Sequence, residues 1–187
     1  MRIISGKFKG RRLKATPPAG IRPTSDKLRE TLFNILGFAV EGSVFLDGCA
    51  GMGAVGIEAL SRGAAMIYFV EQNRKACRAI RDNLEALGVQ EGYRILEMDL
   101  SKGLELLARE GVRFDIAFVD PPYEANELYN AALAKVSLEP SGLLILEHSK
   151  RKELPESVHS MRKVRSLVQG DAALAFYKRN YSAWKEM

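Results

Sequence analysis

The sequence has few cysteines and histidines and no long apolar run. Only two of its 187 residues are cysteines, Cys49 and Cys77, and they are too far apart in sequence to form a metal-spaced pair. We therefore expect neither zinc nor a disulfide. No apolar run reaches membrane-spanning length. Residues 1–7 also lack the long apolar segment of a signal peptide, so we expect a cytoplasmic protein without membrane partners.

Acidic residues are almost missing from one end of the chain. Residues 1–29 contain nine lysines and arginines but a single acid, Asp26, while the whole chain has a net charge of +5. Positive charge gathered at one end is typical of a surface that binds phosphates, although a solvated surface hairpin can have the same composition. We predict that this basic arm contacts nucleic acid through Lys7, Lys9, Arg11, Arg12 and Lys14.

The length of the chain limits its domain organisation. A chain of 187 residues, 47% of them hydrophobic, forms one domain with a sizeable core and a small appendage rather than two full domains. We predict a basic arm and linker over residues 1–20 and a main domain over residues 21–187. In the arm, residues 3–5 and 11–14 flank a glycine-containing turn and are expected to form a small β-hairpin. An apolar face at helical spacing predicts a helix over residues 25–36.

From residue 43 onward, strand patterns and helix patterns alternate, which indicates a parallel sheet. Strands are predicted at 44–47, 66–71, 93–97, 114–120 and 143–147, and helices at 54–62, 74–87, 102–109 and 125–136. Residues 162–168 and 172–177 then flank Gln169-Gly170-Asp171, a sequence typical of a hairpin turn. The predicted fold class is therefore α/β, with a mostly parallel seven-stranded sheet, helices on both faces and an antiparallel C-terminal hairpin.

The tetrapeptide Asp120-Pro121-Pro122-Tyr123 follows the apolar run 114–119, so it lies where a buried strand ends. Open α/β sheets bind their ligands at that edge. The prolines fix φ and lack N–H groups, so a bare Pro121 carbonyl lies beside the Asp120 carboxylate. These two acceptors suit the two N–H groups of a nucleobase amine, and Tyr123 suits stacking on the base. We predict that the tetrapeptide is catalytic, the alternative being an ordinary strand-ending turn.

A glycine-rich segment follows the first predicted strand. Gly51, Gly53 and Gly56 formally match the dinucleotide fingerprint, which leaves an NAD-dependent oxidoreductase as one alternative. However, Asp47 precedes these glycines, and an acid there would repel a pyrophosphate bound at the helix N-terminus. The same acid suits S-adenosylmethionine, which has an α-ammonium, a sulfonium and no phosphate. We therefore predict S-adenosylmethionine as the cofactor.

Acids occur at the ends of the first four predicted strands: Asp47, Glu71, Asp99 and Asp120. Glu71 is placed to accept both ribose hydroxyls of the cofactor, as an acid at the end of the second strand does. Asp99 is expected to accept from the adenine amino group, and the Leu100 amide to donate to a ring nitrogen. Any one of these acids can instead cap a helix. The predicted cofactor site consists of Asp47, Gly51, Gly53, Glu71, Asp99 and Leu100.

Several stretches together carry a family resemblance: Arg2-Ile3-Ile4-Ser5-Gly6, Gly10-Arg11-Arg12-Leu13, Arg22-Pro23-Thr24-Ser25-Asp26, Ile57-Glu58-Ala59-Leu60-Ser61-Arg62-Gly63-Ala64 and the tetrapeptide. With the strand-end acids, they resemble Rossmann-like, S-adenosylmethionine-dependent methyltransferases that act on an exocyclic amine. More narrowly, they resemble the RsmD family, which methylates N2 of one guanine in bacterial small-subunit (16S) ribosomal RNA. The resemblance covers essentially the whole chain.

The chain departs from the family pattern in the cofactor loop. The family usually has a larger residue and an aromatic where this chain has Gly48 and Cys49, and a small residue where Met52 stands. Gly51 and Gly53 are retained. The departure therefore concerns how the loop packs rather than which cofactor binds.

The resemblance implies that the substrate is ribosomal RNA within a small-subunit assembly particle and that the protein acts as a monomer. It also implies that Arg22, Pro23 and Thr24 line the cofactor pocket or close over it. Two alternatives remain open at this point. An adenine-N6 DNA methyltransferase fits because the tetrapeptide recognises an amine rather than a base. A non-catalytic RNA-binding assembly factor with a vestigial methyltransferase fold also fits.

Overall fold

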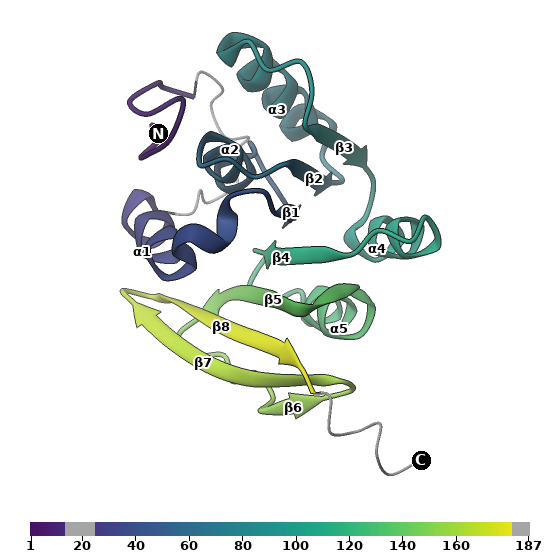
Figure 1. The fold of residues 1–187 in the computed structure, drawn as a ribbon. Coiled ribbons are helices and arrows are strands. Elements are labelled where there is room, and N and C mark those ends of the chain that lie inside the picture. Colours follow the sequence, from purple (N-terminus) through teal and green to yellow (C-terminus); the bar gives the residue numbers. More distant parts are fainter. Residues whose placement is uncertain (14–24, 181–187) are drawn as a thin grey trace.

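The computed structural model describes residues 1–13 and 25–180, and within them a twisted sheet is covered by helices on both faces (Figure 1). The strands are β1 (Val44–Gly48), β2 (Met66–Glu71), β3 (Tyr93–Glu97), β4 (Phe114–Val119), β5 (Leu138–Ser149), β6 (Ser157–Val158), β7 (Met161–Gln169) and β8 (Ala172–Arg179). The helices are α1 (Asp26–Leu36), the short 3-10 helix η1 (Gly37–Val40), α2 (Ala54–Ser61), α3 (Arg74–Leu87), α4 (Leu100–Arg109) and α5 (Asn126–Lys135). The predicted α/β fold class is confirmed.

The strand order is β3-β2-β1-β4-β5-β8-β7-β6. The pairs from β3 to β5 are parallel, whereas β8 pairs antiparallel with both β5 and β7. Strands β2 and β3 follow β1 toward one edge of the sheet, and β4 then pairs with the other side of β1. The loops after β1 and β4 therefore diverge at a topological switch point, which is where open α/β sheets form a ligand crevice.

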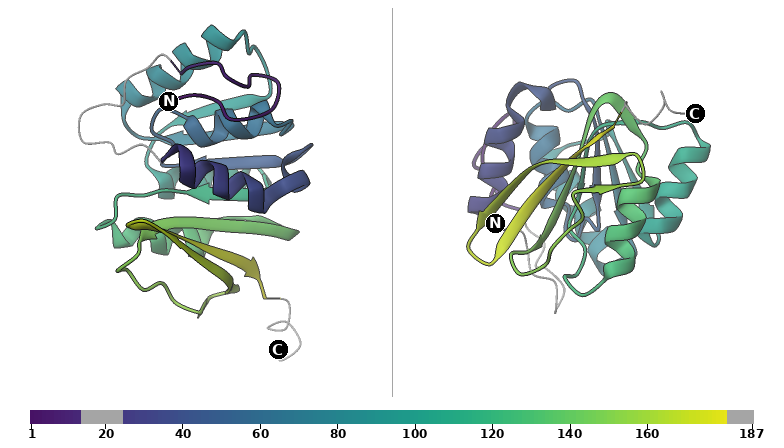
Figure 2. Two further views of the ribbon diagram at one scale, coloured as in Figure 1. Left: turned by 90° about the vertical axis from the view of Figure 1, so that its left-hand side faces the viewer. Right: turned by 90° about the horizontal axis from the view of Figure 1, so that it is seen from below.

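The sheet lies between two layers of helices, with α1, α2 and α3 on one face and α4 and α5 on the other (Figures 1 and 2). Successive side chains of a strand point to opposite faces, so Phe45 packs under the first layer and Leu46 under the second. Both faces of the central strands are buried, which explains why these strands read as continuous apolar runs. In the described part of the chain, none of the helices is long and apolar enough to cross a membrane.

Two details of the sheet differ from the prediction. The short strand β6 pairs Ser157 with Arg162, so the described sheet has eight strands rather than seven. Strand β5 begins at Leu138 rather than at residue 143, because the register shifts where it pairs with the start of β4. This irregular stretch contains Pro140 and Gly142, which are depleted in regular strands and so gave no strand signal.

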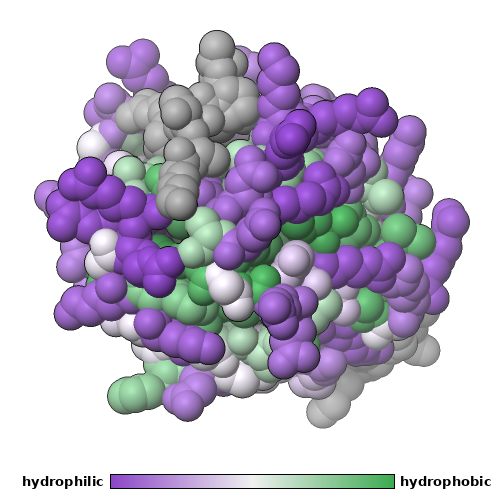
Figure 3. All heavy atoms as spheres, turned by 90° about the horizontal axis from the view of Figure 1, so that it is seen from above, coloured by the Kyte–Doolittle hydropathy of each residue, from purple (hydrophilic) through white to green (hydrophobic). Residues whose placement is uncertain are grey.

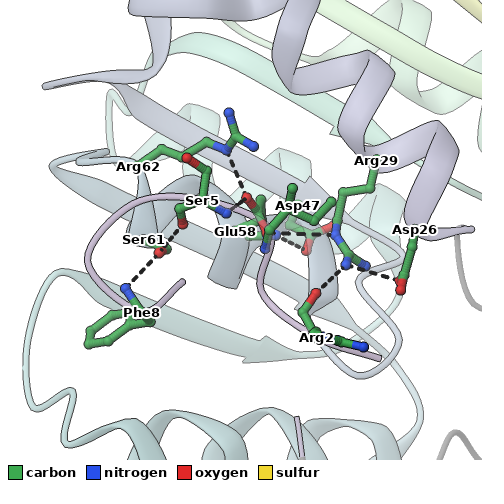
Figure 4. Close-up of polar contacts among 11 residues, drawn as sticks. Arg2, Ser5, Phe8, Asp26, Arg29, Asp47, Glu58, Ser61 and Arg62 are labelled. Atoms are coloured by element: carbon green, nitrogen blue, oxygen red, sulfur yellow. Dashed lines mark hydrogen bonds and ion pairs between the residues drawn. The ribbon is translucent and has the colours of Figure 1, made fainter. Parts of the chain in front are cut away.

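The basic arm folds back on itself as expected: the Ile3 N–H donates to the Arg11 carbonyl and the Gly10 N–H to the Ile3 carbonyl, both at 2.9 Å, although only one isolated antiparallel bridge, Arg2 with Arg12, is formed. Other N–H groups of the arm bond to α2. The Ile4 and Ser5 N–H groups donate to the two oxygens of Glu58, at 2.8 and 3.0 Å (Figure 4). The boundary predicted between residues 1–20 and 21–187 lies outside the described residues.

Glu58 is fully buried, and arginines compensate its charge. Arg62 Nε lies 2.8 Å from one carboxylate oxygen, and Arg29 Nε lies 3.8 Å from the other (Figure 4). A buried carboxylate is costly unless it is paired and hydrogen-bonded, as this one is. Gly6 completes the docking, because a Cβ at its φ of +80° would stand 1.8 Å from the Ser61 carbonyl oxygen. The arm is therefore fixed to α2.

Candidate functional site

A cavity of about 720 Å³ lies at the carboxyl ends of the parallel strands. It is lined by all four predicted strand-end acids, by Gly51 and Leu100, and by the whole tetrapeptide: Asp47, Glu71, Asp99, Asp120, Pro121, Pro122 and Tyr123. Gly53 is not part of the lining. It is the N-cap of α2 with a φ of +79°, and a Cβ there would meet Ile80 and Phe69 at 3.1–3.2 Å. Gly53 thus allows α2 to pack closely on its neighbours.

Glu71 ties the glycine-rich loop to the end of β2. It is nearly buried, and its oxygens accept from the Gly51 N–H at 2.8 Å and from the Asn73 N–H at 2.7 Å. The buried Cys77 thiol supports the same turn by donating to the Glu71 carbonyl at 3.2 Å. A carboxylate has about four acceptor positions, so these bonds leave capacity for ligand hydroxyls. Glu71 therefore shapes the loop and also faces the cavity.

Asp47 is a buried acid beneath the loop, with 2% of its surface exposed. Its Oδ2 accepts from the Gly56 N–H at 2.7 Å, near the start of α2. Burial raises the pKa of Asp47 well above its ordinary value, against the effect of the Gly56 bond, and the charges of Asp120 and Glu71 raise it further. A cation bound nearby would relieve this unfavourable crowding of negative charge.

Asp99 and Leu100 lie together at the start of α4. Asp99 caps the helix, because its Oδ1 accepts from the N–H groups of Ser101 at 2.9 Å and Lys102 at 3.3 Å. The capping role is thus real, and Asp99 lines the cavity as well. The Leu100 N–H is the first of the helix and has no acceptor within it. A carboxylate and a backbone donor are therefore adjacent at this end of the cavity.

The loop that carries the tetrapeptide is held against β1. The Asp120 N–H donates to the Gly48 carbonyl at 3.1 Å, and the Pro122 carbonyl accepts from the Ala125 N–H at 2.9 Å. Asp120 and Tyr123 are partly exposed, whereas Pro121 is buried. The carboxylate thus stands at the rim of the cavity on a backbone fixed at both ends.

Glu147 is a site residue that the sequence analysis missed. It lies near the end of β5, lines the cavity and is 5% exposed. A signal was present, because the fifth predicted strand also ended in an acid, as the first four did. The neighbouring Tyr129 hydroxyl donates to the Glu147 carbonyl at 3.2 Å. Burial raises the pKa of Tyr129, and the charge of Asp120 adds to the effect.

Gly48, Cys49 and Met52, the residues of the expected departure from the family pattern, lie in or beside the cavity. Cys49 and Met52 line it. Burial raises the pKa of the Cys49 thiol, and nearby carboxylates add to the shift, so the thiol stays protonated. Gly48 fits a narrow space, since a Cβ there would meet Val119 at 3.0 Å and Leu100 at 3.1 Å. A larger residue at position 48 would therefore require its neighbours to move.

The predicted phosphate-binding residues that the structure describes lie outside the cavity. Lys7, Lys9, Arg11 and Arg12 are all exposed. Arg11 also has a structural role, because it donates to the Ala86 carbonyl near the end of α3 at 2.7 Å.

Viewed from the α3 end, hydrophilic side chains cover most of the surface, and a band of hydrophobic residues crosses it (Figure 3). The other predicted site residues, Lys14, Arg22, Pro23 and Thr24, fall outside the described part of the chain.

Comparison with known proteins gives a consistent result. The family model "Conserved hypothetical protein 95" matches residues 1–178. Ribosomal RNA small subunit methyltransferase D of Escherichia coli (strain K12) is 34% identical over 96% of this chain and 90% of its own length. The protein of the same name from Haemophilus influenzae is 35% identical over 82% and 81% of the two chains. Among solved structures, a hypothetical protein of Thermus thermophilus, TTHA0928, is 33% identical, with a TM-score of 0.83 over 95% of this chain and 99% of that one.

The raised pKa of Asp47 makes a prediction about stability. The unfolded chain loses this proton near the ordinary pKa of 3.8, whereas the folded protein keeps it to higher pH. Protonated Asp47 therefore contributes its full stabilisation of the folded state at low pH. That stabilisation is lost as pH rises from the ordinary pKa to the raised pKa of the folded protein. Asp47→Asn retains an acceptor for the Gly56 N–H without the charge. We expect the variant to melt above wild type at about pH 8, by about 2–4 °C for each kcal/mol relieved, and by less at about pH 5.

The matched control is Asp115→Asn. Asp115 Oδ2 likewise accepts from a backbone N–H, that of Val44 at 2.8 Å, but it does not line the cavity. Melting temperatures measured by calorimetry at both pH values give the comparison. A difference between Asp47→Asn and wild type that is the same at both pH values would contradict the assigned cause.

Proposed function

The chain belongs to the family of conserved hypothetical protein 95, the RsmD family, and on that basis we propose that it transfers a methyl group from S-adenosylmethionine to the exocyclic N2 amine of a guanine in small-subunit ribosomal RNA. The observation that carries the proposal is the convergence of the strand-end acids and the Asp120 tetrapeptide on one cavity. Relatives named as methyltransferases of small-subunit ribosomal RNA support the choice of reaction and of substrate class.

The polar groups that line the cavity fit S-adenosylmethionine. In this proposal Asp47 lies toward the positively charged amino-acid part, and Glu71 accepts from the ribose hydroxyls. Asp99 and the Leu100 N–H pair with the adenine edge, which presents one donor group next to one acceptor. When bound, the cofactor supplies an activated methyl group on a sulfonium. The NAD-dependent alternative is disfavoured, because Asp47 offers negative charge where a pyrophosphate would need donors.

Asp120 and the Pro121 carbonyl hold the target amine. If each accepts one N–H of the amine, the nitrogen lone pair is turned away from the base and toward the methyl group. The carboxylate also stabilises the positive charge that develops on nitrogen during transfer. When bound, the cofactor would supply the methyl group through its carbon–sulfur bond, and Asp120 or water would take the proton that the methylated nitrogen loses. Orientation of this kind contributes roughly 7–11 kcal/mol in well-aligned intramolecular reactions.

The base must leave its stack to reach this cavity. Enzymes that modify a base inside structured nucleic acid extrude it into a pocket and stack it on aromatic or apolar side chains. Tyr123 is the aromatic residue of the tetrapeptide, and it lines the cavity while remaining partly exposed. We assign it to stacking on the guanine. The vestigial alternative is disfavoured, because the acids needed for cofactor and amine are all retained around one cavity.

The basic arm supplies the second part of the proposal. Lys7, Lys9 and Arg12 expose their charges on a segment whose backbone is fixed to α2, so they offer phosphates a rigid surface. Phosphate contacts position a nucleic acid without reading its sequence. The arm would therefore orient ribosomal RNA, presented in a small-subunit assembly particle, while the cavity selects the base.

The direct test of the catalytic assignment is Asp120→Ala. We expect kcat to fall at least about 10²-fold, the scale seen when one group that stabilises transition-state charge is removed. Cofactor affinity measured by calorimetry should change little. Asp120→Asn retains one acceptor oxygen and should keep more activity than the alanine variant. Near wild-type turnover of Asp120→Ala on small-subunit particles would rule out the assignment.

The test of the arm is a double variant, Lys7→Ala with Lys9→Ala. Arg11 is left intact because it docks the arm on α3. Each phosphate contact contributes about 0.7–0.9 to the slope of log affinity against log salt, so we expect the slope to become shallower by about 1.5.

The charge-matched control is Arg109→Ala with Arg113→Ala, two exposed arginines that lie near the amino end of β4, at the opposite edge from the cavity. Titration of 16S ribosomal RNA at several salt concentrations compares the two double variants. Equal slopes for both would make the arm an ordinary solvated surface.

A further inference from the structure

Glu147 lies beside Asp120 in the cavity, and its place is set by the sheet. Strands β4 and β5 run parallel, with Val119 paired to Leu146. Asp120 is the first residue after β4, and extending the register by one position brings it level with Glu147 of β5, with both side chains on the same face. Neighbouring strands are about 4.8 Å apart. Two acids therefore lie next to each other, and both line the cavity.

The backbone at Glu147 is firmly held. Strand β5 is bonded to β8 on its other side, where Glu147 pairs with Leu174. From α5, the buried Tyr129 hydroxyl donates to the Glu147 carbonyl at 3.2 Å. Asp120, in contrast, stands on the loop that follows β4. A side chain on a rigid strand is suited to recognition, because its geometry is fixed before the ligand arrives.

The hydrogen-bonding groups beside the amine of each nucleobase indicate which base this pair of acids can recognise. In guanine, the N2 amine is next to a ring N1–H, which is a donor. In adenine and cytosine, the ring nitrogen next to the amine is an acceptor. An ionised carboxylate can only accept hydrogen bonds. A carboxylate beside the amine site therefore pairs with the N1–H of guanine and repels the ring-nitrogen lone pair of adenine or cytosine. Flipped bases are commonly read along this Watson–Crick edge.

We propose that Glu147 accepts the N1–H of the target guanine while Asp120 and the Pro121 carbonyl hold its N2 amine. Glu147 is then the residue that determines the base specificity of the reaction. The inference rests on the proposed function, because it takes the amine position at Asp120 as given. It also gives a physical reason for methylation at guanine N2 rather than at adenine N6, a choice that the tetrapeptide alone leaves open.

The first experiment uses wild-type protein and changes only the base. Once mass spectrometry has mapped the methylated position in 16S ribosomal RNA, that guanine is replaced by 2-aminopurine in small-subunit particles reconstituted from ligated RNA. This analogue keeps the amine but has an acceptor at N1. We expect kcat/KM to fall by about 10- to 10²-fold, the range for loss of a hydrogen bond to a charged group. 6-Thioguanine keeps the N1–H while changing position 6, and should be methylated at close to the guanine rate.

The second experiment changes the protein. Glu147→Gln can turn its amide to donate to N1 of 2-aminopurine, so the preference for guanine over the analogue should shrink to within about 3-fold. The matched control is Glu139→Gln, on the same strand but outside the cavity lining, which should keep the wild-type preference. Cofactor affinity of Glu147→Gln, measured by calorimetry, should equal that of wild type.

Each failure has a distinct meaning. Equal wild-type rates on guanine and 2-aminopurine would overturn the assignment of Glu147 and leave the proposed function standing. A loss of cofactor affinity in Glu147→Gln, with the preference for guanine kept, would assign Glu147 to the cofactor instead and overturn the inference. Absence of methyl transfer to any guanine by wild type would overturn the proposed function and the inference with it. If Glu147→Gln fails to fold, equal wild-type rates on the two bases would still overturn the inference.

Discussion

The crowding of carboxylates at one edge of the sheet is the constraint on which the site depends. Buried charges are costly unless hydrogen bonds or opposite charges compensate them. Here the backbone provides part of that compensation: Gly56 donates to Asp47, Gly51 to Glu71 and Ser101 to Asp99. Each acid is thereby fixed and gives shape to the loop that it binds. The remaining negative charge favours a cationic ligand, which is the property that the proposed cofactor provides.

Helix α2 connects this acidic cavity to the basic arm. Near its start, the Gly56 N–H holds Asp47, and further along the same helix the buried Glu58 binds the backbone of the arm. A single helix of eight residues therefore positions both a cavity acid and the surface proposed to grip RNA. The close approach of Gly6 to α2 leaves the arm little freedom to shift against it. The arrangement gives a bound phosphate backbone a fixed position relative to the cavity.

Much of the fold was predictable because its signals are local. The apolar strands and amphipathic helices from β1 to α5 were found to within a few residues, and their alternation predicted the parallel sheet. The strand-end acids came together because parallel strands end at one edge. What failed depends on contacts distant in sequence. The fold-back of the arm was expected, but its docking on α2 was not, because no local pattern shows that Glu58, 54 positions away, will accept from the Ile4 N–H. The start of β5 was missed since Pro140 and Gly142 mimic a loop.

The central claim is that this cavity methylates the N2 amine of a guanine in small-subunit ribosomal RNA. The most direct measurement is mass spectrometry of nucleosides from small-subunit particles that lack the modification, after incubation with the protein and S-adenosylmethionine labelled in its methyl group. The account predicts that the label appears in N2-methylguanosine at one position. Label in N6-methyladenosine, or no label in the RNA, would contradict it.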